Sequence, residues 1–114
     1  MSTAVEALKA YIGSLDTKCV EVPEMGAEGE PLRLYYTPFN GVDMAQMQRK
    51  HKDFPSIDIE AMVDVILMKA LTSDGEKAFG LDDKPLLRRL PQELIFRIAT
   101  PFLSSTTVEE HEGN

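Results

Sequence analysis

The side chains able to carry out covalent or acid–base chemistry are few, and their spacing forms no reactive group. Cys19 is the single cysteine, and a catalytic cysteine needs a histidine positioned beside it. The two histidines are His51 and His111, and His111 lies in a polar C-terminal stretch. We therefore interpret Cys19 as a small strand residue. Two histidines so far apart in the sequence also predict no zinc site.

The acidic residues lack the arrangement needed for catalysis or for calcium binding. Asp82 and Asp83 are adjacent at the start of a short helical pattern, where carboxylates cap amide groups and favour the positive end of the helix dipole. The stretch "DGEKAFGLDD" superficially resembles a calcium loop, but Phe79 occupies the position that requires glycine. No nucleophile elbow or phosphate-binding glycine run is present. The sequence predicts a protein that is not an enzyme and uses no metal and no cofactor.

The overall charge restricts the class of partner. The chain has 12 Lys and Arg against 19 Asp and Glu, which gives a formal net charge of −7. Non-specific nucleic-acid binding depends on basic residues, so neither nucleic acid nor an anionic membrane is expected as a partner. The short basic runs at residues 49–52 and 88–89 are typical of solvated helix faces. No apolar run is long enough to span a membrane, no signal peptide is recognisable, and we expect a soluble cytoplasmic protein.

Hydrophobic periodicity divides the first third of the chain into a helix and a hairpin. In "STAVEALKAYIGSL" the apolar residues recur at spacings of three and four, which predicts an amphipathic helix. These residues are Val5, Leu8, Ile12 and Leu15. In "CVEVPEM" and "PLRLYYTP", apolar and polar residues alternate, with a glycine-containing turn between the two stretches. This pattern predicts a β-hairpin, which must pack on helices because two strands alone are only marginally stable.

The remaining two-thirds are predicted to be helical. Helices are expected at residues 41–53 and 56–72, with Ser56 as the cap of the second, and at 81–90 and 91–103, where Pro101 should end or kink the helix near Thr100. The predicted fold class is therefore α+β and predominantly α-helical, with about five helices packed with one β-hairpin. Residues 1–103 are expected to form a single globular domain, and residues 104–114 a disordered acidic tail.

The helix predicted at residues 56–72 is apolar on two sides. Its second face carries Ile57, Ala61, Val65 and Met68, in addition to a regular core-facing stripe. Two interpretations remain open: the helix is central in the core, or the second face binds a partner. For the partner interpretation, the candidate contact residues are those of the second face together with apolar residues of neighbouring helices, methionine being adaptable at binding surfaces. They are Ile57, Val65, Met68, Met44, Met47 and Phe102.

The stretches "LRLYYTPFNG", "ALTSDGEKAF" and "LLRRLPQELIFRIATPFL", in this order, resemble the tail assembly chaperones of long-tailed (siphovirus-type) bacteriophages and prophages. Members of that family often have an extended segment with an aromatic residue before a turn, a D-G-x-x-x-F element and a terminal amphipathic helix. The resembling part covers roughly the last two-thirds of the predicted domain.

This resemblance implies a non-enzymatic chaperone that binds the phage tape-measure protein and keeps it soluble before tail-tube subunits polymerise around it. It implies a homo-oligomer in the host cytoplasm that is not retained in the mature virion, with the tail-tube protein as a further partner. Two alternatives stay open. One is a structural phage tail or head–tail joining protein. The other is a small helical regulatory DNA-binding protein, which should gather basic residues on an exposed helix face, although residues 56–72 contain only Lys69.

Overall fold

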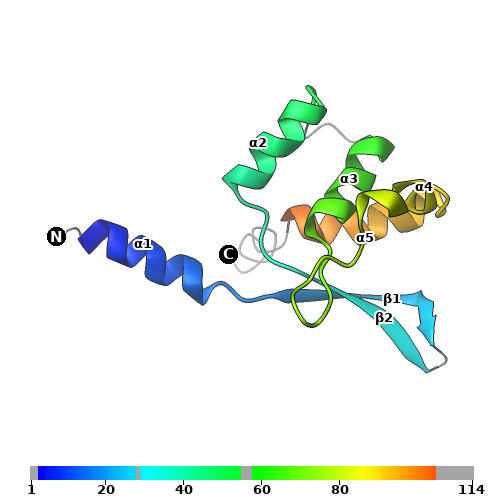
Figure 1. The fold of residues 1–114 in the computed structure, drawn as a ribbon, viewed down its shortest axis with the longest axis horizontal. Helices are drawn as coiled ribbons and strands as arrows, with labels where there is room; N and C mark the ends of the chain where they lie inside the picture. Colours follow the sequence, from blue (N-terminus) through cyan, green and yellow to red (C-terminus); the bar gives the residue numbers. More distant parts are fainter. Residues whose placement is uncertain (1–2, 28, 55–57, 105–114) are drawn as a thin grey trace, which may run out of the picture.

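The computed structural model describes residues 3–27, 29–54 and 58–104, which form five α-helices, one short 3₁₀ helix and a two-stranded antiparallel sheet (Figure 1). The elements in chain order are α1 (Thr3–Ser14), β1 (Lys18–Ala27), β2 (Glu30–Tyr36), α2 (Gly41–Lys50), α3 (Ile59–Lys69), η1 (Leu81–Asp83), α4 (Lys84–Leu87) and α5 (Gln92–Ser104). The predicted helix-dominated α+β class is confirmed. Ile57 and residues 105–114 of the predicted tail lie outside the described residues.

The hairpin presents one apolar face to the helices. Its register runs from Lys18 opposite Tyr36 to Ala27 opposite Glu30, with an irregularity between Val22 and Gly26. Gly26 has a φ of 110°, and a Cβ there would lie 2.5 Å from the carbonyl oxygen of Glu30, so the irregularity requires glycine. The alternation predicted from the sequence is present: the side chains turned toward the helices are those of Val20, Val22, Leu32, Leu34 and Tyr36.

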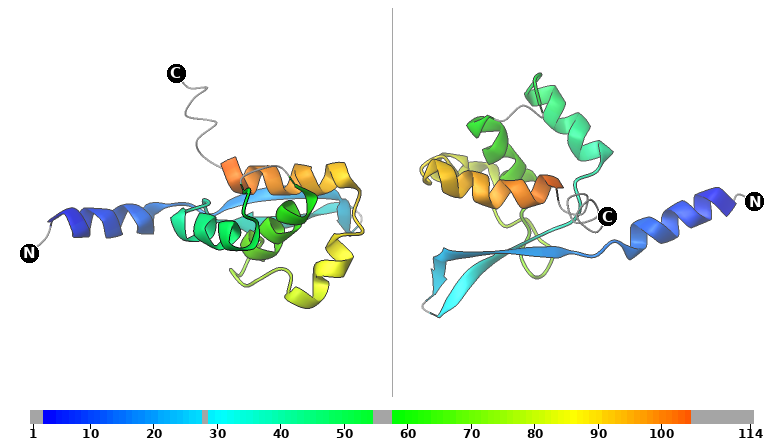
Figure 2. Two further views of the ribbon diagram at one scale, coloured as in Figure 1. Left: turned by 90° about the horizontal axis from the view of Figure 1, so that it is seen from above. Right: turned by 180° about the vertical axis from the view of Figure 1, so that it is seen from behind.

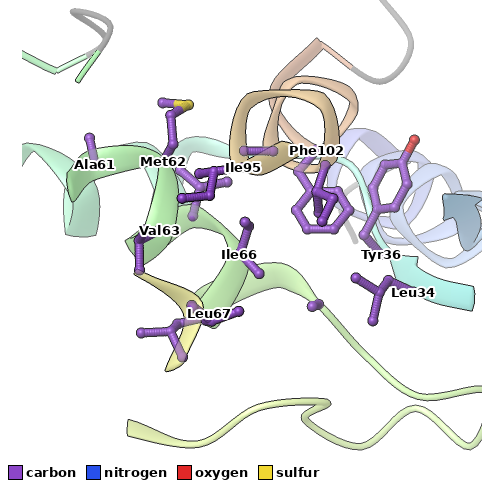
Figure 3. Packing of buried hydrophobic residues seen from close by; sticks show 14 of the residues in the cluster. Leu34, Tyr36, Ala61, Met62, Val63, Ile66, Leu67, Ile95 and Phe102 are labelled. Atoms are coloured by element: carbon purple, nitrogen blue, oxygen red, sulfur yellow. The ribbon is translucent and has the colours of Figure 1, made fainter. Parts of the chain in front are cut away.

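The core lies between this face of the hairpin and a layer of helices in which α3 is central. Residues 61–67 of α3 are all buried. The helix packs on α5, and Figure 3 shows Ile66 of α3 near Ile95 and Phe102 of α5. The ring of Phe102 lies 4.7 Å, centroid to centroid, from that of Tyr36, and so joins α5 to β2. Ala61 and Val65, on the second apolar face of α3, are fully buried, which supports the interpretation of this helix as central in the core.

The ends of the central helix differ from the prediction of a helix over residues 56–72. The N-cap is Asp58, whose carboxylate accepts a hydrogen bond from the Glu60 amide. Ser56, the predicted cap, lies outside the described residues. At the other end the chain leaves the helix after Lys69, and Leu71 exchanges two backbone hydrogen bonds with Tyr35, at 2.7 and 2.9 Å. These bonds satisfy part of the outer edge of β2, whose amide and carbonyl groups otherwise have no strand partner.

Pro101 was predicted to end or kink the last helix near Thr100; it does not end the helix, because α5 continues to Ser104, and the kink stays a prediction. Proline removes one backbone donor and leaves the carbonyl of Arg97 without its usual partner. Arg97 is exposed, so water can satisfy that carbonyl. Beyond the proline, Phe102 is completely buried, and this burial holds the last turn of α5 against the core.

One buried lysine fixes the connection between the hairpin and α2. Lys69 is 6% exposed, and its Nζ lies 2.7 Å from Oδ2 of Asp43 and 3.2 Å from Oγ1 of Thr37. Asp43 also accepts a hydrogen bond from the amide of Asn40, while the Asn40 side chain accepts one from the Asp43 amide. The last turn of α3 is thereby tied to the first turn of α2.

We expect Val65→Asp to unfold the protein. A buried carboxylate without a partner costs several kcal/mol, a large part of the total stability of about 5–15 kcal/mol for a domain. The matched control is Val42→Asp, because Val42 is 65% exposed and the same change there should leave the thermal midpoint within a few degrees. Circular dichroism melts of both variants measure this. A folded Val65→Asp variant would show that α3 is not central.

We also expect Lys69→Ala to lower the free energy of unfolding by about 1–3 kcal/mol, because it leaves the carboxylate of Asp43 with fewer partners in a half-buried site. Lys9→Ala, on the fully exposed helix α1, is the control and should change it by less than about 0.5 kcal/mol. Urea denaturation gives both values. Equal effects would mean that the Lys69 contacts do not hold α2 to α3.

Candidate protein-binding surface

Helix α1 lies apart from the rest of the molecule. In Figures 1 and 2 it extends away from the end of the hairpin, and the other helices lie on the far side of the connection at residues 15–17. Every residue of α1 is exposed. The sequence predicted this helix correctly, and the structure places its apolar side chains in an exposed position.

The exposed helix carries a regular apolar face. Leu8, Tyr11, Ile12 and Leu15 follow the spacing i, i+3, i+4, i+7 of one helix face, and their exposed fractions are 57%, 64%, 57% and 37%. We call these four residues the α1 face. Val5, one turn earlier, is 46% exposed. Apolar side chains that stand alone on a surface need no explanation, but a contiguous apolar patch indicates an interaction site.

The length of α1 strengthens this conclusion. The helix has 12 residues, and isolated helices of about 12–15 residues are marginal in water because nucleation is costly. In proteins such helices are stabilised by burying their apolar side. The described part of this chain provides no such contact for the α1 face, so the geometry favours burial against another protein chain.

The residues predicted to contact a partner are not brought together on one exposed face. Met47, Val65 and Phe102 are fully buried among the chain's own side chains. Met44 and Met68 are half-buried and pack against the core, so a partner contact by these two stays a prediction. The sequence signal for the more exposed face was present in the spacing of Leu8 and its neighbours, but spacing alone does not tell whether such a stripe faces the chain's own core.

A buried polar cluster joins α3 to α2 and α4. Asp64 is 5% exposed, its Oδ2 lies 2.7 Å from Nε2 of His51, and its Oδ1 lies 2.8 Å from Nζ of Lys84. Burial raises the pKa of the Asp64 carboxyl, but the hydrogen bonds from Lys84 and His51 lower it by more, so the pKa lies below its ordinary value. Each carboxylate oxygen thus has one close partner, Oδ1 through the ion pair with Lys84 alone, and the cluster is therefore structural.

The remaining chemical candidates have structural positions. Cys19 lies in β1 opposite Tyr35, as predicted for a strand residue. Of the two adjacent aspartates, Asp83 accepts a hydrogen bond from the amide of Gly80 at 2.8 Å and so takes the capping role. Among the residues that the structure describes, no group of His, Cys, Asp and Glu side chains is arranged to hold a metal ion. No helix in the described ranges is both long and apolar enough to cross a membrane.

No protein-family model matches this chain, and no curated protein matches it in sequence. Among solved structures, the chain is similar to the tail assembly chaperone of bacteriophage HK97, with a TM-score of 0.49 and 17% sequence identity. The similar region covers 88% of this chain and 96% of that chaperone. A similarity of this size is a weak structural relationship, and it assigns no function to the chain.

We expect Asp64→Asn to lower the free energy of unfolding at pH 7 by about 1–3 kcal/mol. Because the pKa of Asp64 is lower in the folded protein, its carboxylate contributes stability above the unfolded pKa of about 3.9, and this contribution is lost as the pH falls through the folded value. The difference between the wild type and Asp64→Asn should therefore shrink below about pH 4. Urea denaturation at pH 7 and at acidic pH measures it.

The matched control is Asp53→Asn, since Asp53 is exposed. Its effect should be small at both pH values. If Asp64→Asn and Asp53→Asn behave alike, the buried cluster does not contribute to stability.

Proposed function

We propose that this protein is a tail assembly chaperone of a long-tailed bacteriophage or prophage, which binds the tape-measure protein and keeps it soluble before the tail tube polymerises. The observation that carries the proposal is the α1 face, an amphipathic helix surface exposed outside the core. A tape-measure protein is long and helical, and an apolar helix face is the natural contact for the apolar side of another helix.

The stretches that resemble the chaperone family correspond to defined parts of the fold. "LRLYYTPFNG" forms most of β2 and the connection to α2, and the last resembling stretch ends in α5. The D-G-x-x-x-F element forms a loop in which Gly75 has a φ of 87°, a conformation that favours glycine. The motif residues therefore shape the body of the protein, while the proposed contact surface lies in α1, outside the resembling part.

The charge of the chain fits a soluble coat around an apolar client. A net charge of −7 adds repulsion that opposes precipitation of the complex. Binding of many copies along one client multiplies individually weak contacts. On this proposal the protein acts in the host cytoplasm, is absent from the mature virion and has the tail-tube protein as a further partner.

Self-association is part of the proposal. In the described residues β1 pairs only with β2, and an unpaired outer strand edge favours contact with a second chain. Together with the α1 face, this edge gives two surfaces by which copies can join. Light scattering at high concentration should therefore detect species larger than the 12.7 kDa chain.

The alternative of a DNA-binding protein built on helices 41–53 and 56–72 has less support. The second of these helices is α3, which is nearly surrounded by the rest of the protein, and its only lysine is buried on Asp43. A structural tail protein remains the second candidate. The two candidates differ in whether the protein stays in the virion. Mass spectrometry of purified virions would detect a structural tail protein, whereas the chaperone should be absent.

The test is capture of the tape-measure protein encoded in the same tail gene cluster, co-expressed in fragments with this chain. We expect Leu8→Asp/Ile12→Asp to reduce capture by at least about tenfold, because the two carboxylates would be desolvated only in the complex. The melting temperature of the free protein should hardly change, since both side chains are exposed in it.

The matched control is Val42→Asp/Leu86→Asp, which introduces the same charges at residues that are 65% and 61% exposed outside α1. This variant should capture the client as the wild type does. Wild-type protein that captures no tape-measure fragment would overturn the proposed function. Equal capture by the two double variants would overturn the role of the α1 face.

A further inference from the structure

A groove of about 570 Å³ lies between the second half of α2, the second half of α3 and the loop at residues 77–81. Its lining combines an apolar surface with basic residues. The apolar part includes Met68 and Phe79, both half-buried, and Leu81, which is 76% exposed and is the most exposed large apolar side chain in the described residues. Arg49 and Lys50 line it from α2.

The basic residues of the groove are not neutralised by the protein itself. Arg49 and Lys50 are exposed, and within the described ranges neither forms an ion pair. Lys77, the third lining cation, has a structural use, since its Nζ donates to the carbonyl of Met68 at 2.6 Å at the end of α3. The groove therefore keeps two exposed positive charges that form no ion pair within the described residues, in a chain whose net charge is −7.

The acidic residue that lines the groove offsets these charges only in part, since it interacts with Lys50 through charge alone and contacts neither Arg49 nor Lys50. It is Asp64, and both of its oxygens are already engaged, one by His51 at 2.7 Å and the other by Lys84 at 2.8 Å. A ligand entering the groove thus meets an apolar floor bordered by Arg49 and Lys50. Electrostatic complementarity requires acidic groups on that ligand, and the exposed Leu81 requires an apolar group beside them.

We infer that this groove binds a segment of a partner protein in which acidic residues flank a large apolar side chain, most simply an acidic amphipathic helix. The inference deepens the proposed function and rests on it in one respect: the segment is assigned to the tape-measure client. The helix α1 of a second copy is a poorer occupant, because its described residues carry one acidic and one basic side chain, Glu6 and Lys9, and so no net charge. The apolar floor and the acidic chain disfavour nucleic acid.

The test uses the full-length protein and two labelled synthetic peptides of 18 residues, designed as helices with leucines along one face. One peptide has glutamates beside the leucines, and the other has lysines at the same positions. Fluorescence anisotropy at low salt should give a Kd at least about tenfold lower for the glutamate peptide, and the difference should decrease as salt is added.

Charge reversal locates the binding site. Arg49→Glu/Lys50→Glu should abolish the preference for the glutamate peptide or reverse it. The matched control is Lys9→Glu/Arg89→Glu, which makes the same change in net charge at exposed residues that do not line the groove, and it should keep the preference. Leu81→Ala should weaken binding of the glutamate peptide. Melting curves establish that each variant is folded.

Two results would overturn the inference: equal affinity of the wild type for both peptides, or the same loss of preference in the groove variant and in the control. The proposed function can fail separately. If the groove selects the glutamate peptide but the wild type captures no tape-measure fragment, the preference of the groove for acidic segments is supported. Its assignment to the tape-measure client is then wrong. If capture depends on the α1 face but no peptide preference exists, the chaperone function stands without this groove.

Discussion

The burial of α3 on nearly all sides is the constraint on which the rest of the structure depends. A helix in this position must supply apolar side chains in several directions, and Ile66 and Val65 are both fully buried although they belong to different faces. The same burial forces its two buried charged residues to find partners inside the protein. Asp64 binds His51 and Lys84, and Lys69 binds Asp43. These contacts fix where α2 and α4 lie, so the polar groups of the core decide the arrangement of the outer helices.

The burial of α3 also explains why the binding surfaces must be sought elsewhere. Ala61 and Val65 of the second apolar face are already covered by the chain, and α5, α2 and α4 pack against this helix. The α1 face has no comparable cover among the described residues, and the helix that bears it is too short to be stable in water by propensity alone. The described chain thus has two parts: residues 18–27, 29–54 and 58–104 form the body, and α1 lies exposed beside it, where it provides the proposed attachment point.

Local patterns in the sequence predict the elements of this fold well, because each pattern reports a local preference. The change of period at residues 19–36 locates the hairpin, and the spacing of Leu94, Ile95 and Ile98 locates α5. The features that these patterns do not predict depend on contacts between residues far apart in the sequence. The end of α3 is determined by hydrogen bonds between Leu71 and Tyr35, and the position of the His51 ring is determined by its contact with Asp64. No periodicity in either segment contains that information.

The candidate surfaces illustrate the same limit. Spacing predicted that α1 is amphipathic, but whether its apolar side meets the chain's own core depends on whether the core has room for it, and here the other elements fill the core. The groove could not be predicted from the sequence for a different reason. Its cations belong to a basic run at residues 49–52 that is typical of a solvated helix, and only the loop that brings Phe79 and Leu81 beside α2 gives those charges an apolar neighbour. An apolar helix face selects partners weakly, whereas a basic groove selects by charge. A client that satisfies both would be held more tightly than by either alone, and general affinity for apolar helices would thereby become preference for one protein.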